Sequence, residues 1–240
     1  MLRIIFHIVF LHSFLISQEF FFIDEKISAS FKMGSMSSNT KTYISDFEEY
    51  TRTNLSFKGK GIARLMSRDM VNGTIVSFKD STLININHKK RKFSKKTFTE
   101  IIEDRGEEIN KSESNNNKDN QNTDFFISDS VYNVNNYLCE KLVINNPDQT
   151  IEVWFTKNLI KPDYVKNINE QVSNIGLGWR NVSINFEKYD IDNEVIMVKL
   201  INRSKDGDFI YELISYEQAD EIPNSHFLPK EYKEVDRITF

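Results

Sequence analysis

The sequence predicts a mainly β fold of the α+β class: one antiparallel sheet or barrel of about ten strands with about two appended helices. Three observations support this prediction. Apolar and polar residues alternate in several short runs, turn-forming residues separate those runs, and only two segments have helical spacing. Because strands do not alternate regularly with helices, a parallel β/α fold is disfavoured.

The composition limits the classes of function. The chain has 240 residues, 39% of them hydrophobic, which is enough to bury a core as one large domain or two small ones. Its formal net charge of −4 lacks the basic excess with which proteins neutralise nucleic acid, so we expect no nucleic-acid partner. The lone cysteine, Cys139, excludes an internal disulfide and a cysteine-based metal site.

Residues 1–17 have the pattern of an export signal. Arg3 supplies a positive charge, and an apolar run with a few polar interruptions follows it. The run is too short for a comfortable transmembrane helix, which needs about 20 apolar residues. We therefore expect cleavage near Ser17 as the chain is exported. The alternative is an uncleaved membrane anchor, because Phe20–Ile23 would lengthen the apolar stretch.

The first half of the exported chain reads as an antiparallel meander. Ile27–Met33 alternates apolar and polar residues, as a strand with one buried face does. Lys58–Gly61 has turn composition, and Asn72-Gly73 between two apolar runs is a strong hairpin signal. The further strands predicted in this half are Thr40–Ser45, Glu49–Phe57, Gly61–Met66, Thr74–Phe78 and Thr82–Asn87.

A short helix and a polar insertion follow. Thr97 and Glu100 have the spacing of a capping box, so a helix is expected to begin there. Residues 106–123 form an asparagine-rich stretch that cannot bury enough apolar surface to offset its ordering entropy. We expect 106–123 to be a disordered insertion in a single domain spanning 18–240. Two separate halves joined by this stretch are the alternative.

The second half resumes strand patterning and contains the second helix. Asn145–Gln149 and Lys205–Asp208 have turn composition. Pro162 opens a segment in which apolar residues recur at helical spacing up to Ile175, and Gly176 is a typical residue to end it. The strands predicted here are Phe125–Ser128, Tyr137–Ile144, Thr150–Thr156, Val182–Phe186, Glu194–Ile201 and Phe209–Tyr216.

No set of residues has the pattern of a catalytic or metal site. His88 lies in a basic run and His226 near the C-terminal end, and neither has a second histidine at metal-binding spacing. Cys139 alternates with apolar residues of a predicted strand, so we expect a buried, unreactive thiol rather than a nucleophile. The glycines fit no phosphate-binding motif. We therefore expect a protein that is not an enzyme and uses no cofactor and no metal.

A basic patch lies in the run His88–Lys96. One interpretation is peripheral contact with a membrane, in which each cation near anionic headgroups contributes about 1 kcal/mol. The other is a charged sheet edge that prevents aggregation between sheets. The cations of the basic patch are Lys89, Lys90, Arg91, Lys92, Lys95 and Lys96.

Several short motifs occur in a fixed order. They are Phe31–Met36, Thr42–Asp46, Tyr137–Leu142, Val153–Leu159 and Phe227–Asp236. In this order they resemble the bacterial secreted domain-of-unknown-function family 4412 (DUF4412), over a span from Ile27 to Asp236. That family is similar in shape to periplasmic lipoprotein-localisation factors (LolA-like), in which a curved, incomplete antiparallel barrel holds an apolar cavity under helices.

The resemblance implies a fold and a periplasmic or extracellular location in the bacterial envelope, and it supplies no activity. Asn136 stands where the family pattern leads us to expect glycine, and asparagine tolerates the left-handed turn conformation well. The asparagine-rich insertion is the second departure from the pattern.

The first functional hypothesis is a carrier of a lipid, an acyl chain or another apolar ligand. A strongly curved sheet leaves an interior that side chains or a ligand must fill, and the helix beginning at Pro162 would cover it. The candidate ligand-binding residues are Ile160, Val165, Ile168, Val172, Ile175 and Trp179. The alternative is a structural module with a self-filled core that binds an envelope protein partner.

Overall fold

The computed structural model describes residues 20–104, 124–167, 184, 186–192 and 194–238. The predicted signal at 1–17 and the asparagine-rich stretch at 106–123 lie outside these residues. Among the helices of the described residues, none has the length and apolar character needed to cross a membrane.

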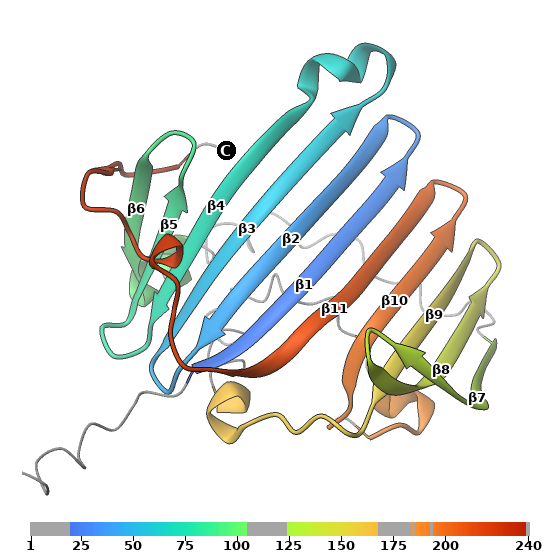
Figure 1. Cartoon of the computed structure of the whole chain (residues 1–240). Helices are drawn as coiled ribbons and strands as arrows, with labels where there is room; N and C mark the ends of the chain where they lie inside the picture. The colour runs from blue at the N-terminus through green and yellow to red at the C-terminus, as the bar shows by residue number, and fades with distance from the viewer. Residues whose placement is uncertain (1–19, 105–123, 168–183, 185, 193, 239–240) are drawn as a thin grey trace, which may run out of the picture.

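The described chain forms one sheet of twelve strands (Figure 1). The strands are β1 (Phe20–Phe31), β2 (Gly34–Ile44), β3 (Glu48–Gly59), β4 (Arg68–Ser77), β5 (Thr82–Asn87), β6 (Lys92–Thr97), β7 (Asp124–Val134), β8 (Tyr137–Asn146), β9 (Gln149–Thr156), β10 (Ile196–Ser204), β11 (Gly207–Ala219) and β12 (Lys233–Glu234). Their order is β12-β6-β5-β4-β3-β2-β1-β11-β10-β9-β8-β7. The sheet is curved and open, which confirms the mainly β prediction, although it has more strands than the ten or so expected.

Two antiparallel meanders meet at β1. Successive strands are neighbours within β1–β6 and within β7–β11, and β11 pairs with β1. The pairing runs from Phe20 opposite Ala219 to Phe31 opposite Gly207. Among the described strands, only β12 runs parallel to its neighbour, β6. The first of the described strands is therefore central in the sheet.

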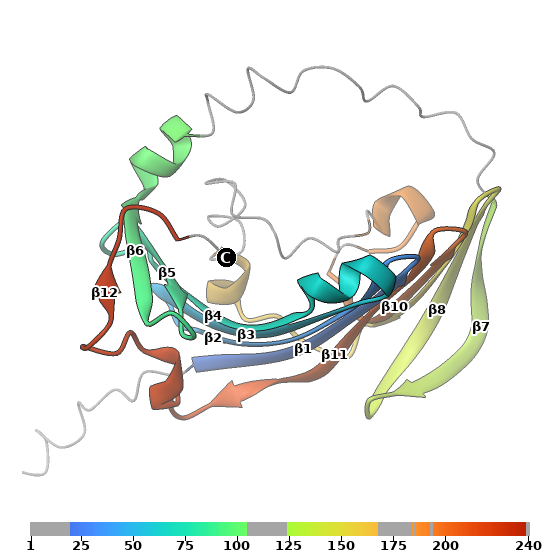
Figure 2. The same ribbon diagram turned by 90° about the horizontal axis from the view of Figure 1, so that it is seen from above.

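Short segments cover both faces of the sheet (Figure 2). The helical segments 98–104 and 163–167 and the 3₁₀ turn η2 (Phe186–Tyr189) lie on the concave side. The C-terminal segment with η3 (Asn224–His226) lies on the convex side. Because successive side chains of a strand point to opposite faces, apolar residues near the start of β1 are buried on the concave side and partly buried on the convex side.

The larger core lies on the concave side and extends over β8–β11. Its fully buried members include Leu142, Val153, Phe155, Val165, Val198 and Leu213. A smaller core lies on the convex side beneath the C-terminal segment, and its buried members are Tyr43, Tyr50, Ile75, Ile86 and Ile222. Burying each large apolar side chain contributes about 1.5–3 kcal/mol, so these two cores are the main source of stability.

The sheet has two unlike ends. The antiparallel order places the β1–β2 turn, the 3₁₀ turn η1 (Gly61–Met66) between β3 and β4, and the β5–β6 turn at one end, which we call the loop end. It is the upper end of the long strands in Figure 1. The opposite end of β1–β4, which we call the core end, carries Phe21, Ile44, Tyr50 and Val76, all of them buried.

Phe20–Ile23, which would lengthen a membrane anchor in one interpretation of the sequence, begins β1. Phe21 and Ile23 belong to the concave core, whereas Phe20 and Phe22 pack against the convex core. The run is continuously apolar because both faces of the sheet are covered at this point.

Asn72-Gly73 was predicted as a hairpin turn, and this prediction is wrong, because both residues lie inside β4. A Cβ atom on Gly73 would lie 3.0 Å from Nε2 of His88. The glycine therefore allows the imidazole to approach the strand, which is another reason for glycine within a strand.

Several predicted strands have other bounds in the structure; for example, the strand predicted at Phe125–Ser128 is part of the longer β7. Gly61–Met66 is the 3₁₀ turn η1, which begins at Gly61 with a φ of 58°. The first predicted strand ends at Phe31 rather than Met33, since Met33 lies in the β1–β2 turn. Of the strand predicted at Val182–Phe186, Phe186 begins η2, and residues 182, 183 and 185 lie outside the described residues.

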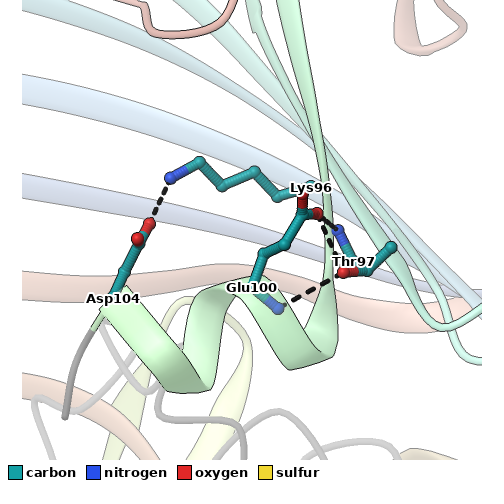
Figure 3. A network of polar contacts seen from close by, with 4 residues as sticks. All are labelled: Lys96, Thr97, Glu100 and Asp104. Carbon is teal, nitrogen blue, oxygen red and sulfur yellow. Dashed lines mark hydrogen bonds and ion pairs between the residues drawn. The ribbon is translucent and has the colours of Figure 1, made fainter.

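The predicted capping box is confirmed (Figure 3). The main-chain N–H of Thr97 donates to Oε2 of Glu100 at 2.6 Å, and the N–H of Glu100 donates to Oγ1 of Thr97 at 3.3 Å. These two bonds satisfy main-chain donors at the start of helical segment 98–104, as this motif requires. The hydroxyl of Thr97 also donates to Oε2 of Glu100 at 2.8 Å, and the bonds from the N–H and the hydroxyl of Thr97 lower the pKa of the Glu100 carboxyl. The segment packs on the concave face through Ile101.

The turn at Asn136 has the left-handed conformation that the sequence predicts. Asn135 and Asn136 connect β7 and β8 with φ angles of 52° and 70°. Both are left-handed, which asparagine adopts more readily than most residues. Asn136 therefore provides the conformation for which glycine was expected.

Candidate functional site

The concave face changes in character along one row of side chains. Cross-strand partners share a face, so the register places Ile23, Thr42, Thr51, Thr74, Asn85 and Ser94 in one row from β1 to β6. On the other side of β1, the same face carries the concave core. The concave face is thus mainly apolar on β8–β11, whereas on β2–β6 it carries many hydroxyl and amide groups beside the small cluster of Val76, Leu83 and Ile101.

The hydroxyl groups form pairs across β2 and β3. Oγ1 of Thr42 lies 3.1 Å from Oγ1 of Thr51, and the same distance separates Thr40 from Thr53. Thr51 also donates to Oε1 of Glu49 at 3.1 Å. Glu49 is only 5% exposed. Buried hydroxyl and carboxyl groups are costly unless they are hydrogen-bonded, so the pairing makes this polar interior tolerable.

Three amides on the concave face are incompletely satisfied: Asn72 on β4, Asn146 on β8 and Asn202 on β10. Asn72 is the partner of Thr53 in the register of β3 and β4. Its Oδ1 atom is buried and accepts no hydrogen bond from the described residues. A buried acceptor without a donor costs about 1–3 kcal/mol. The position would therefore favour a donor group from a bound molecule.

The boundary between the two halves lies at β1 and β11. The hydroxyl of Tyr211 donates to Oε1 of Glu25 at 2.7 Å, which connects an aromatic ring of β11 with a carboxylate of β1. Nearby, Phe21 contacts Tyr216 edge to face, with ring centroids 4.4 Å apart. Burial raises the pKa of the Tyr216 hydroxyl. The boundary therefore combines apolar rings with fixed polar atoms.

Two of the predicted ligand-binding residues lie in the described part of the chain, and they differ. Val165 is fully buried in the concave core, and its N–H donates to the carbonyl of Pro162 at 3.0 Å. Ile160 is 86% exposed. The other candidates, Ile168, Val172, Ile175 and Trp179, lie outside the described residues. The first turn of the predicted covering helix therefore packs on the sheet as core.

The basic patch occupies a hairpin next to the sheet edge. Lys89, Lys90 and Arg91 lie in the β5–β6 turn, and Lys92, Lys95 and Lys96 lie on β6. Within the described sheet, only the two-residue strand β12 borders β6 on its outer side. The six cations do not form one surface, because successive residues of β6 face opposite sides, and Lys96 forms an ion pair with Asp104 (Figure 3).

Both histidines hold the C-terminal segment on the convex face. Nδ1 of His88 lies 3.2 Å from the hydroxyl of Tyr232, and the ring of His226 packs edge to face on Tyr43. Burial, together with Arg52 and His226, lowers the pKa of His88 to about 4. Burial and Arg52 also lower the pKa of His226. These contacts give both residues a structural role in the convex core.

Cys139 is 1% exposed and belongs to the concave core. Burial raises the pKa of its thiol to about 11, so little thiolate exists at neutral pH, and the thiolate is the reactive form. Within the described residues, no three acidic, histidine or cysteine side chains are grouped so that they could hold a metal ion.

The polar half of the concave face was not predicted from the sequence. Its signal was the spacing of threonines in two runs, Thr40-Lys41-Thr42 and Thr51-Arg52-Thr53. Threonines that alternate with a lysine or an arginine are typical of a strand exposed to solvent on both faces. The structure shows instead that Thr42 and Thr51 are buried and that Lys41 and Arg52 lie on the convex side.

No known family model matches the chain, and no curated protein matches it either. Among solved structures, the chain is similar to PNGF-II, with a TM-score of 0.31 and 14% identity over 91% of this chain and 31% of that chain. It thus spans about a third of the length of PNGF-II.

Two further solved structures match over most of their length. One is an uncharacterized conserved protein from Thermus thermophilus, with a TM-score of 0.37 and 7% identity over 92% of both chains. The other is a DUF1329 family protein from Desulfovibrio piger, with a TM-score of 0.24 and 11% identity over 91% of this chain and 93% of that chain.

Proposed function

We propose that the protein is a non-enzymatic binding protein of the cell envelope whose concave face carries an amphipathic ligand of the lipid class. The observation that supports this proposal is the change from apolar to hydroxyl-rich side chains along the concave face at β1. An acyl chain would lie along the apolar side of that boundary. A polar headgroup would contact the paired threonines and the amide of Asn72.

The chemistry of the polar half suits a neutral or donor-rich headgroup. Hydroxyl groups both donate and accept hydrogen bonds, and the buried carboxylate of Glu49 and the Oδ1 atom of Asn72 accept them. Such a surface would repel an isolated anion, because it presents acceptors and a carboxylate. We therefore expect a ligand with hydroxyl or amine groups at its polar end.

A second candidate is a structural or protein-binding module, and one observation favours it. Val165, Phe186 and Tyr189 pack into the concave core from segments that cover the sheet. If the rest of the interior is filled in the same way, no room is left for an acyl chain. The test must therefore distinguish an interior filled by the protein's own side chains from one that holds a ligand.

The experiment is native mass spectrometry of the purified protein, together with organic extraction and lipid analysis. We expect a copurified molecule in wild type and its loss in the double variant Thr40→Val/Thr53→Val. Replacing both partners of a hydrogen bond by apolar groups of similar shape is nearly neutral for stability, so the fold should persist. The matched control is Ser37→Ala/Ser56→Ala, a cross-strand pair of the same strands on the convex face.

Two results would contradict the proposal. Wild-type protein that carries no extractable molecule and binds no fatty acid or apolar dye would favour the self-filled module. Equal retention of the ligand by both double variants would show that the threonine pair does not contact it. A thermal melt of each variant confirms that the protein compared is folded.

We also propose that the chain is exported and loses its first 17 residues or so, which is the usual length class of a signal. Intact mass of protein recovered from the envelope fraction checks this expectation. A full-length mass, with protein that resists carbonate extraction, would instead support the uncleaved anchor.

A further inference from the structure

Three large apolar side chains are exposed at the loop end. Ile62 and Leu65 of η1 are each 91% exposed, and Met33 in the β1–β2 turn is 66% exposed. In a 3₁₀ helix, residues three positions apart lie on the same side. Ile62 and Leu65 therefore form a single apolar ridge that points into solvent. None of these three belongs to a core cluster of the described residues.

A hydrogen bond connects η1, which carries the ridge, with the β1–β2 turn, which carries Met33. The N–H of Lys60 donates to the carbonyl of Met33 at 2.8 Å. The N–H of Gly59 donates to the hydroxyl of Ser67 at 2.9 Å, which closes the base of η1. A Cβ atom on Gly59 would lie 1.8 Å from the carbonyl oxygen of Ala63. The turn thus folds tightly against the end of β3, and its apolar side chains are held outward.

Cations predominate in the segment that carries the ridge. Residues 58–68 contain Lys58, Lys60, Arg64 and Arg68, and the nearest acidic residue in the sequence is Asp69, which follows directly. The basic patch adjoins this region, because Nζ of Lys89 lies 3.4 Å from the carbonyl oxygen of Asp69. The basic hairpin and η1 thus place positive charge at the same end of the sheet. Exposed aliphatic side chains in a segment rich in cations are typical of a surface that docks on anionic lipid.

We propose that the loop end is a membrane-docking surface for an anionic lipid bilayer. Ile62, Leu65 and Met33 enter the interface between headgroups and acyl chains, and the neighbouring cations contact lipid phosphates. The ridge is a protruding turn rather than a flat face, and a stable protein interface buries about 800 Å² on each partner. A tip of three side chains suits insertion into a fluid surface better than docking on a rigid one.

The test is cosedimentation of the purified protein with vesicles at about 0.1 M salt. The vesicles are phosphatidylcholine alone, or phosphatidylcholine with about one third phosphatidylglycerol, because anionic lipid attracts nearby cations. We expect binding to the anionic vesicles only, and weaker binding at about 0.5 M salt because the ionic attraction is screened. The double variant Ile62→Ser/Leu65→Ser should bind at least about tenfold more weakly, since it loses the inserted apolar surface.

Two further variants separate the contributions. Val131→Ser removes an exposed apolar side chain of β7, elsewhere on the molecule, and it should bind like wild type. Lys60→Gln/Arg64→Gln should weaken binding by about fivefold for each cation removed, without a change in the melting temperature. All variants have the same N-terminus as the wild type, so any vesicle binding by the N-terminal segment is equal in every sample.

Three results would overturn the proposal: no binding of wild type to anionic vesicles, equal binding by wild type and Ile62→Ser/Leu65→Ser, or equal loss of binding in Val131→Ser. A concentration-dependent dimer in light scattering that the ridge variant abolishes, without vesicle binding, would assign the ridge to a second copy of the chain instead. These outcomes do not depend on whether a ligand occupies the concave face, so the two proposals fail separately.

Discussion

Strands β1–β4 bury their apolar side chains at one end and expose apolar side chains in the turns at the other end. At the core end, Phe21 and Ile44 are covered on the concave side and Tyr50 on the convex side. At the loop end, Leu65 and Met33 have solvent around them. The difference shows that stability and surface properties are separated along the strands. Apolar residues at the core end stabilise the fold, whereas those in the turns at the loop end pack against no core cluster of the described residues.

The largest expected effect comes from removing an apolar side chain at the core end. Ile44 is completely buried, so Ile44→Ala should lower the free energy of unfolding by about 2–5 kcal/mol through lost burial and the cavity left behind. Leu65→Ala at the loop end should change it by less than about 0.5 kcal/mol. Urea denaturation of both variants measures the contrast. Similar losses at both ends would break the comparison.

The second effect is the pH dependence of the C-terminal segment that covers the convex face. The pKa of His88 is about 4 in the folded protein and about 6.5 when unfolded. Because the folded pKa is the lower one, the unfolded state binds the proton first as pH falls below about 6.5. The resulting loss of stability is complete near pH 4. Arg52, His226 and Tyr232 face this ring. The charge of Arg52, and that of His226 once it is protonated, oppose protonation of His88.

Between about pH 7.5 and pH 5, this titration should lower the free energy of unfolding by about 1–2 kcal/mol. His88→Gln, which cannot titrate, should lose correspondingly less over the same interval. Urea denaturation at the two pH values measures both proteins. An identical loss in wild type and variant would show that other groups cause the pH dependence.

The third effect is smaller and concerns the lone thiol. Cys139→Ala removes a small buried side chain of the concave core, and we expect a cost of about 0.5–2 kcal/mol from packing alone. The native thiol should also resist a bulky maleimide at neutral pH, because its pKa is raised to about 11. Rapid labelling of the folded protein, or stoichiometric zinc in elemental analysis, would contradict a purely structural role.

The smallest expected effect on stability comes from removing the cap of helical segment 98–104. Thr97→Ala removes the hydroxyl that accepts from the N–H of Glu100, and loss of such a cap costs about 1 kcal/mol. Thr97→Ser keeps the hydroxyl and serves as the control. Circular dichroism melts can resolve this difference. A cost near zero would mean that Ile101 holds helical segment 98–104 to the sheet without help from its cap.

The strand pattern could be predicted from the sequence because it depends on local alternation. The capping box at Thr97 and the left-handed turn at Asn136 are also local signals, and both are present in the structure. Gly73 could not be predicted, because its role depends on the ring of His88, which follows the next strand and is not visible in Asn-Gly itself. Tertiary contact overrode a strong turn preference at this position.

The candidate site was less predictable for a similar reason. Helical spacing identified Val165 as an inward residue, and it is buried. Helical spacing alone does not say whether an inward residue faces a ligand or a packed core. The threonine rows were missed because Thr42 and Thr51 form a polar interior only when neighbouring strands align them. Side-chain alternation predicts faces, while the pairing of strands decides which face is enclosed.

The pairing of β1 with β11 sets the order in which the protein can fold. Glu25 and Tyr211, which are hydrogen-bonded across this pair, stand 186 positions apart in the chain. The β1–β6 meander emerges first during synthesis, and it presents β1 as an open edge carrying Phe21 and Ile23 until β11 arrives. Such an edge pairs readily with other chains, and bringing distant segments together is slow. We expect the nascent chain to be most vulnerable to aggregation in that interval, and a chaperone that shields β1 to raise the yield of folded protein.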